Sequence, residues 1–181
     1  MIIKDLATCG KKYQVIYADP PWEFGTWGKT GWKAPQRHYN CLPLLDIIAF
    51  PIEKLADKDC VLFLWTTYPA LQQSFYVIEG WGFHYSTIGF TWVKTTKNGK
   101  YHYGLGFWTR ANPEVCLLAT KGHPKRINKG IAQLVVSPVR EHSKKPDEVR
   151  ERIVTLMGNL PRIELFARQQ IEGWDCWGDE V

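Results

Sequence analysis

With 181 residues, the chain can bury one ordinary domain core, and the length excludes a second domain of normal size. Its 45% hydrophobic and 23% charged residues exclude a disordered or membrane-embedded chain. The net charge of +5 is concentrated: residues 92–145 hold 11 lysines and arginines against two acidic residues, which leaves −4 for the remainder. The first residues lack a secretory signal, so we expect one cytoplasmic domain over residues 1–181.

Apolar segments rich in β-formers alternate with helical segments along the chain, a pattern typical of an α/β protein with a mostly parallel sheet. In chain order, the pattern predicts a strand at 13–18, a helix at 44–49, a strand at 60–65, a helix at 69–79, strands at 85–93, 114–120 and 134–136, a helix at 146–157 and a strand at 162–167. Long glycine- and lysine-containing loops are predicted at 24–39 and 95–112. Loops of this length in a compact domain are usually functional.

Asp19-Pro20-Pro21-Trp22 follows the first predicted strand. An open α/β sheet places ligand-contacting groups at this end of its strands. A carboxylate next to a carbonyl that two prolines hold in place offers two hydrogen-bond acceptors to a planar amine such as that of adenine, with Trp22 available to stack on the ring. The alternative is that the prolines only end a strand.

The basic segment is interleaved with aromatic residues, which make up 14% of the chain and include nine tryptophans. Cations next to exposed rings are typical of a surface that neutralises phosphates and stacks bases. The alternative is a solvated cationic face without a partner. The five cysteines are widely spaced and contain no Cys-x-x-Cys pair, so we expect no metal site.

Seven blocks of sequence resemble the MT-A70 family, in family order and over nearly the whole chain. They are 15–22 around Asp19, His38-Tyr39, Leu62-Phe63-Leu64-Trp65, Thr91-Trp92-Val93-Lys94, Glu114-Val115-Cys116-Leu117 with Lys121-Gly122, 143–148 and 163–168. That family contains the catalytic subunit of the eukaryotic messenger-RNA N6-adenosine methyltransferase and bacterial and phage adenine methyltransferases. The resemblance, closest in type to the bacterial and phage enzymes, implies transfer of a methyl group from S-adenosylmethionine to N6 of adenine in nucleic acid.

The resemblance also implies a Rossmann-like class I methyltransferase fold in permuted order, with the catalytic block first, the cofactor strand last and helices on both faces of the sheet. Lys145, directly before a predicted helix, matches the family lysine that pairs with the cofactor's carboxylate, and a helix N-terminus favours such an anion. Asp179 and Glu180 stand where the family commonly has amide side chains; a frayed C-terminus is the alternative for them. The residues implied at the cofactor are Ile2, Asp19, Lys145, Phe166, Arg168, Gln170, Asp179 and Glu180.

By the same resemblance, the two long loops cover the target base. The implied substrate contacts are Trp22, Lys29, Lys33, Arg37, Tyr39, Lys94, Lys97, Lys100 and Arg110. Most of these side chains suit phosphates better than base edges, so we expect relaxed sequence specificity without a separate target-recognition domain. We favour DNA over RNA, because the chain lacks the zinc-finger module or long arm that RNA-directed members often carry.

Three alternatives stay open at this point. The chain could be an RNA N6-adenosine methyltransferase, a non-catalytic nucleic-acid-binding subunit with a methyltransferase fold, or an enzyme that methylates another planar amine or amide, such as cytosine N4 or a protein glutamine. A homo-oligomer or a partner subunit is compatible with the sequence, and the resemblance places the protein in a bacterial or phage-infected cell.

Overall fold

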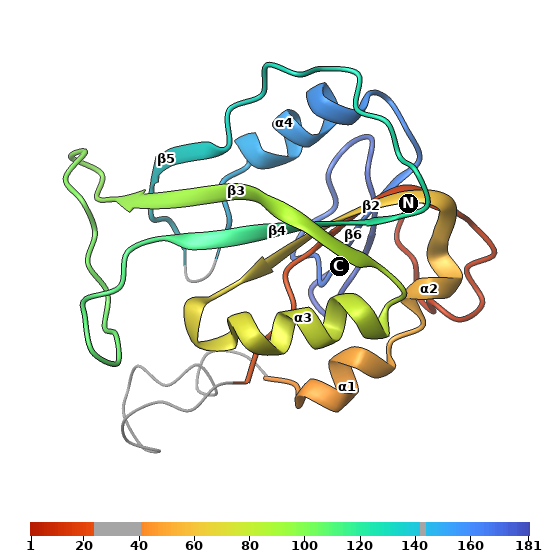
Figure 1. Ribbon diagram of the computed structural model, residues 1–181, viewed down its shortest axis with the longest axis horizontal. Coiled ribbons are helices and arrows are strands. Elements are labelled where there is room, and N and C mark those ends of the chain that lie inside the picture. The colour runs from red at the N-terminus through yellow and green to blue at the C-terminus, as the bar shows by residue number, and fades with distance from the viewer. Residues whose placement is uncertain (24–40, 142–143) are drawn as a thin grey trace.

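The computed structural model describes residues 1–23, 41–141 and 144–181 (Figure 1). The strands are β1 (Tyr13–Ala18), β2 (Ala56–Thr66), β3 (His84–Thr95), β4 (Glu114–Lys121), β5 (Leu134–Pro138), β6 (Arg162–Leu165) and β7 (Asp175–Trp177). The helices are α1 (Leu44–Ala49), α2 (Ile52–Leu55), α3 (Leu71–Gly80), which follows the 3-10 turn η2 (Tyr68–Ala70), and α4 (Glu148–Met157). Every predicted strand and helix is present in the described part of the chain, and β7 is an addition that the sequence pattern did not predict.

The seven strands form one sheet in the order β5-β3-β4-β2-β1-β6-β7. Four neighbouring pairs are parallel, but β4 runs antiparallel to both β2 and β3. The prediction of a mostly parallel sheet is therefore confirmed in part, and the sheet is mixed. The cause is that β3 and β4 are joined directly by a loop, and a direct connection without a crossover helix makes neighbouring strands antiparallel.

Helices cover both faces of the sheet, as the sequence predicted (Figure 1). Successive side chains of a strand point to opposite faces, so β1 contributes Ile16 to one core and Tyr17 to the other. The core that contains Ile16 is closed by α1, α2 and α3, and the core that contains Tyr17 is closed by α4. Both cores are continuous across the central strands.

The register of the strands gathers several chain segments at one edge of the sheet. Ala18, the last residue of β1, pairs with Leu165, the last residue of β6, so Asp19 and Phe166 leave the sheet side by side. Because β4 is reversed, its first residue Glu114 arrives at the same edge, opposite Trp92 of β3. We call this end of the sheet the catalytic edge, after the predicted role of Asp19.

The C-terminal segment is packed tightly against the end of β6. The amide of Ala167 donates to the carbonyl of Trp177 at 2.9 Å. A Cβ atom on Gly178 would lie 2.3 Å from the carbonyl oxygen of Ala167, so only glycine allows this approach. Phe166 is the one described non-glycine residue with a positive φ, +58°, which re-aims the chain directly after β6.

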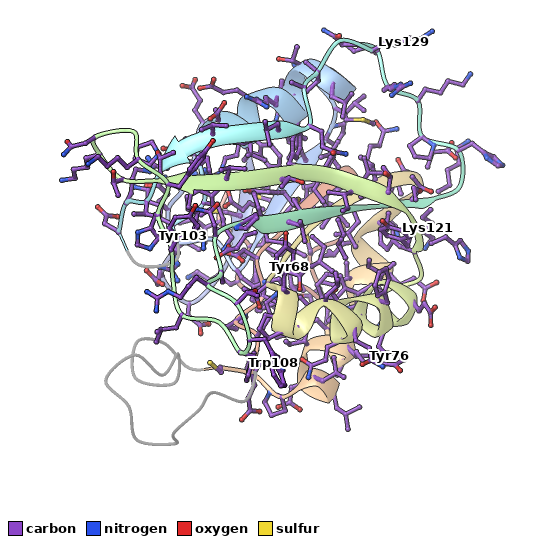
Figure 2. All side chains as sticks on the ribbon, turned by 60° about the vertical axis from the view of Figure 1, so that its left-hand side comes forward. Tyr68, Tyr76, Tyr103, Trp108, Lys121 and Lys129 are labelled. Carbon is purple, nitrogen blue, oxygen red and sulfur yellow. The ribbon has the colours of Figure 1, made fainter. Side chains whose placement is uncertain are left out.

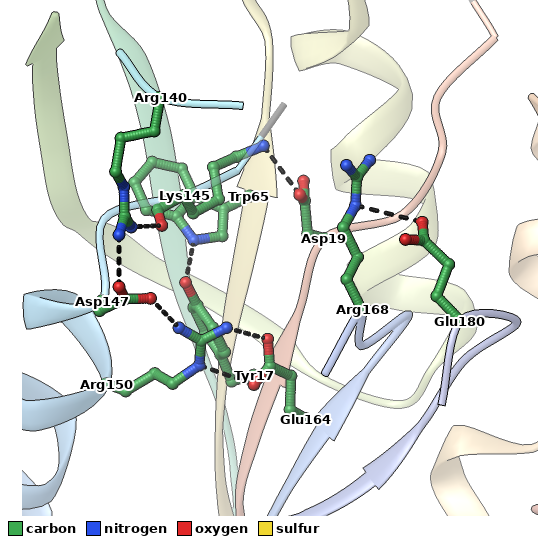
Figure 3. A network of polar contacts seen from close by, with 10 residues as sticks. All are labelled: Tyr17, Asp19, Trp65, Arg140, Lys145, Asp147, Arg150, Glu164, Arg168 and Glu180. Carbon is green, nitrogen blue, oxygen red and sulfur yellow. Dashed lines mark hydrogen bonds and ion pairs between the residues drawn. The ribbon is translucent and has the colours of Figure 1, made fainter. Parts of the chain in front are cut away.

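A buried ion pair joins α4 to β6. The guanidinium of Arg150 donates to both carboxylate oxygens of Glu164, at 2.7 and 2.6 Å, and both side chains are almost fully buried. Arg150 also pairs with Asp147, which accepts a second bond from Arg140 (Figure 3). The same Arg140 donates to the backbone carbonyl of Lys145 at 2.9 Å, so these ion pairs fix the segment that enters α4.

We predict that Arg150→Leu lowers the free energy of unfolding by about 3–5 kcal/mol, because it leaves the carboxylate of Glu164 buried without its partner. Urea unfolding measures this loss. Lys121→Ala is the control: its ion pair with Glu53, at 3.6 Å, is exposed, so the expected change is about 0–1 kcal/mol. Equal, small losses in the two variants would contradict a structural role for the buried pair.

Candidate active site at the catalytic edge

The segment after β1 is held by its own backbone. The carbonyl of Pro20 accepts the amide of Trp22, and the carbonyl of Pro21 accepts the amide of Leu42, both at 2.9 Å. The two prolines restrict φ, so the chain has little freedom between Asp19 and Trp22. Asp19 therefore stands on a rigid support at the point where the sequence predicted a ligand-contacting carboxylate.

Trp22 does not occupy the position that the sequence analysis gave it. Its side chain lies in the core on the α1–α3 face with 4% exposure, and its Nε1 donates to the carbonyl of Trp65 at 2.9 Å. The expected stacking of this indole on a base is therefore wrong for this structure. Burying the large apolar ring is more favourable in free energy than leaving it exposed to water at the end of the strand. The buried indole instead holds the Asp-Pro-Pro turn in place.

Lys145 is the central group of the site. Its side chain is only 8% exposed, and its Nζ lies 2.8 Å from Oδ2 of Asp19 (Figure 3) and 3.3 Å from Oε2 of Glu114. The ammonium also lies over the ring of Trp65, 5.6 Å from its centroid. The residue that sequence comparison assigned to the cofactor thus holds two carboxylates from β1 and β4 together.

Glu114 is a member of the site that the sequence analysis missed. Its second oxygen, Oε1, accepts a hydrogen bond from Nζ of Lys94 at 2.5 Å. Asp19, Lys145, Glu114 and Lys94 therefore form a row of alternating charges, which we call the edge network. The available signal was an acidic residue that opens the otherwise apolar strand Glu114-Val115-Cys116-Leu117, a place where an unpaired charge is costly.

The electrostatics of the edge network separate its two carboxylates. Burial raises the pKa of Asp19 above its ordinary value, and Lys145 offsets this effect only in part. Burial also acts to lower the pKa of Lys145, but the two carboxylates outweigh it and leave that pKa raised. At Glu114, burial acts to raise the pKa, but the two lysines outweigh it and lower the pKa. Lys145 thus stays charged, and Asp19 is the carboxylate that more readily accepts a proton.

Several of the predicted cofactor residues gather beside Asp19. The ring of Phe166 meets Phe50 and Trp177 edge-on, with centroids 5.4 and 5.3 Å away, and the three rings form one cluster. Arg168 reaches Oε1 of Glu180 at 3.5 Å, and this pair lies next to Asp19 (Figure 3). An aromatic cluster and a pair of charged side chains therefore lie next to each other at the ends of β1 and β6.

The other predicted cofactor residues are Ile2, Gln170 and Asp179. Ile2 runs alongside β7, where the amide of Ile3 and the carbonyl of Met1 bond to Cys176. Gln170 and Asp179 are exposed on the surface. The structure thus places Asp19, Lys145, Phe166, Arg168 and Glu180 at this end of the sheet, Ile2 beside β7, and Gln170 and Asp179 on the surface.

Apart from Trp22, the predicted substrate residues that the structure describes divide into two groups. Lys94 belongs to the edge network, whereas Lys97, Lys100 and Arg110 are exposed on the loop 96–113, which connects β3 to β4 at the same edge. Lys29, Lys33, Arg37 and Tyr39 lie outside the described residues.

The basic segment is not one surface. Lys121 ends β4 at the opposite edge of the sheet, and the loop after it carries Lys125, Arg126 and Lys129 (Figure 2). The other seven of the 11 basic residues in 92–145 lie before β4 or after β5, toward the catalytic edge. Charge counted along the sequence therefore overstates the cation density at the site.

Comparison with known proteins identifies the group of proteins to which this site belongs. The sequence pattern of the MT-A70 family matches residues 13–180. The chain belongs to the MT-A70 family. Among the described residues of this family member, no three His, Cys, Asp or Glu side chains are grouped to hold a metal ion, and no described helix is long and apolar enough to cross a membrane.

Named relatives extend the comparison. The chain is 34% identical to the Type II methyltransferase M.MunI of Mycoplasma sp, over 94% of this chain and 78% of the relative. It is 31% identical to the human N(6)-adenosine-methyltransferase catalytic subunit METTL3, over 91% of this chain and 27% of the relative. The Arabidopsis thaliana N(6)-adenosine-methyltransferase MT-A70-like protein is 28% identical over 93% of this chain and 24% of its own length. This MT-A70 chain thus spans about a quarter of these two eukaryotic relatives.

We predict that Trp22→Ala lowers the free energy of unfolding by about 3–5 kcal/mol, because it removes a buried indole from the core. Trp22→Phe keeps a ring but leaves the carbonyl of Trp65 without its donor, so a loss of about 1–3 kcal/mol is expected. Urea unfolding separates these values from the control Trp108→Ala, an exposed indole whose removal changes stability by about 0.5 kcal/mol or less. If the Trp22→Ala protein were as stable as that control, the result would contradict the burial of Trp22.

Proposed function

We propose that this chain is an S-adenosylmethionine-dependent methyltransferase that modifies the exocyclic N6 of adenine in nucleic acid. The observation that carries the proposal is the carboxylate of Asp19, held by the buried Lys145 at an edge of the sheet and flanked by Phe166 and Arg168 of the adjacent strand end. Membership in the MT-A70 family and relatives named as N6-adenosine methyltransferases support it.

The order of the elements supports a permuted Rossmann-like fold. The segment with Asp19 follows the first strand, and the segment with Phe166 follows β6, close to the end of the sequence. In the sheet these two strands are parallel neighbours, so groups from both ends of the sequence meet at one edge. The carboxyl end of adjacent parallel strands is where open α/β sheets bind nucleotides.

The residues at the edge fit S-adenosylmethionine. The cluster of Phe50, Phe166 and Trp177 offers apolar ring edges to the adenine, and the carboxylates of Asp179 and Glu180 can accept hydrogen bonds from ribose hydroxyls. Arg168, Gln170 and the backbone of Ile2 complete the proposed set. The ammonium of Lys145 pairs with Asp19 and Glu114, and the cofactor's carboxylate would take the place of one of these protein carboxylates beside it.

When bound, the cofactor supplies an electrophilic methyl group on a sulfonium. The residues of the chain then have to orient a weak nucleophile, because the lone pair of the adenine amine is delocalised into the ring. Asp19 accepts a hydrogen bond from one N–H of N6, and the carbonyl of Pro20 uses its second lone pair for the other, since the amide of Trp22 takes the first. The proton that N6 loses on methylation would pass to Asp19, whose raised pKa favours its uptake. Correct placement supplies most of the rate.

We favour DNA over RNA as the substrate. The match covers 78% of the Type II methyltransferase M.MunI, but only about a quarter of the eukaryotic N6-adenosine methyltransferases. Incubation of the protein with labelled S-adenosylmethionine and matched single-stranded DNA, duplex DNA and RNA, followed by mass analysis of the nucleosides, tests both base and sugar. Labelled N4-methylcytosine, or binding of nucleic acid with no transfer at all, would contradict the proposal.

We predict that Asp19→Asn lowers kcat about 100- to 1000-fold or more, because it replaces a charged acceptor aimed at the developing charge on N6 by an amide. Transfer of labelled methyl groups measures the rate, and calorimetry checks that the cofactor still binds. For the native protein, the rate is expected to fall on acidification at a higher pH than for an ordinary aspartate, since burial raises the pKa of Asp19 and the protonated carboxyl loses its acceptor charge. Near-native turnover in Asp19→Asn would remove this residue from the chemistry.

We predict that Lys145→Ala weakens cofactor affinity roughly ten- to a hundredfold, the equivalent of one charged hydrogen bond, with a smaller effect on the saturated rate. Isothermal calorimetry measures the affinity, and Lys144→Ala, the neighbouring and more exposed lysine, is the matched control. The double variant Lys145→Ala with Glu114→Gln removes one of the carboxylates that lysine loss leaves unpaired. Recovery of affinity in the double variant would show that Lys145 acts only by holding the carboxylates.

A further inference from the structure

The loop 96–113 exposes a row of large apolar side chains. Trp108 (Figure 2) is 99% exposed, and it is accompanied by two further apolar residues in the same short stretch, Leu105 at 63% and Phe107 at 48%. Tyr101 and Tyr103, earlier in the loop, are also more than half exposed. Single exposed apolar residues are normal on protein surfaces, but several on one loop mark a contact site.

The loop is held in place by polar contacts, although it buries little apolar surface. The side-chain amide of Asn112 donates to the carbonyls of Lys94 and His102, and its oxygen accepts the amide of Lys94. Nearer the tip, the amide of Gly104 donates to the carbonyl of Ala111 at 2.7 Å. These bonds present the segment 105–110 as a projecting tip, and the exposure of Trp108 is a property of a supported loop.

The position of the loop indicates what it contacts. It begins two residues after Lys94 and ends directly before Glu114. Both residues belong to the edge network, so both ends of the loop lie at the catalytic edge. Lys97, Lys100 and Arg110 on the same loop are exposed cations that suit the phosphates of a strand whose base reaches Asp19. Cations beside exposed rings at this edge favour nucleic acid over an apolar protein surface as the occupant.

We propose that Trp108 inserts into the base stack beside the target adenine and occupies the space that the adenine leaves when it turns out of the duplex. This inference rests on the proposed function, because it takes nucleic acid as the ligand of the site. An adenine paired within a duplex cannot reach a carboxylate at the edge of a sheet, and its extrusion loses stacking and pairing. An aromatic side chain that stacks on the neighbouring bases restores part of the lost stacking, so one inserted indole offsets much of the cost of extrusion.

The test compares substrates that differ only in how hard the adenine is to extrude. A duplex methylated by the native protein is assayed next to the same duplex with a mismatch opposite the target and to the single strand alone. Trp108→Ala is expected to lower kcat/KM on the perfect duplex roughly tenfold or more, with much smaller losses on the mismatched and single-stranded substrates. Trp108→Phe, which keeps a ring, should lie between, and Ile127→Ala, an exposed apolar residue on the loop after β4, should match the native protein.

A second readout does not depend on methyl transfer. With 2-aminopurine at the target position of the duplex, the native protein should raise the fluorescence as the base unstacks, and Trp108→Ala should raise it less at equal occupancy, measured by anisotropy. If the native protein methylates no substrate yet still unstacks the probe, the proposed function fails and the role of Trp108 stands. The role of Trp108 would be overturned if Trp108→Ala lowered kcat/KM equally on all three substrates, or if it caused no loss on any of them. It would also be overturned if the kinetics were unchanged but sedimentation showed altered association of the protein. That last result would assign the loop to a protein contact.

Discussion

The site depends on one buried ammonium. Lys145 is enclosed between the carboxylates of Asp19 and Glu114, and a charge removed from water in this way persists only when oppositely charged groups surround it. This requirement joins the end of β1, the start of β4 and the entry to α4 at one point. Arg140 and Arg150 extend the constraint, because they fix the backbone of Lys145 and the first turn of α4 through Asp147. The same set of ion pairs therefore determines both the geometry of the site and the position of α4.

Much of the fold could be predicted because it is written in local patterns. The run of apolar β-formers at 13–18 predicted β1, and the two prolines after Asp19 predicted where the strand ends. The N-terminal proline and the acidic first turn predicted a helix at 146–157, which the structure has as Glu148–Met157. The position of the site was also indicated locally, because Asp19 is a carboxylate at the end of a central strand, where open α/β sheets bind their ligands.

The parts that could not be predicted depend on partners distant in sequence. Asp19 and Lys145 are 126 residues apart, so no local pattern shows that they meet or that Glu114 completes their pairing. The motif alone predicted that the ring of Trp22 is available to a base. The core residues that enclose this ring come from other parts of the chain, so its burial could not be predicted locally. The direction of β4 and the short outermost strand β7 depend on pairing between strands, and the β-propensity of the residues does not determine that pairing.

The reversal of β4 also determines how this architecture can vary. Because β3 and β4 are paired neighbours, the loop 96–113 leaves and re-enters the sheet at adjacent points, as in any β-hairpin. The entropy of closing such a loop grows slowly, by roughly 0.6 kcal/mol for each doubling of its length, so insertions there scarcely affect the stability of the domain. A variant can therefore lengthen or exchange the tip that meets the ligand while Lys94 and Glu114 keep their ladder positions. The substrate range of the enzyme can thus diversify by changes in a segment on which the folding of the catalytic edge does not depend.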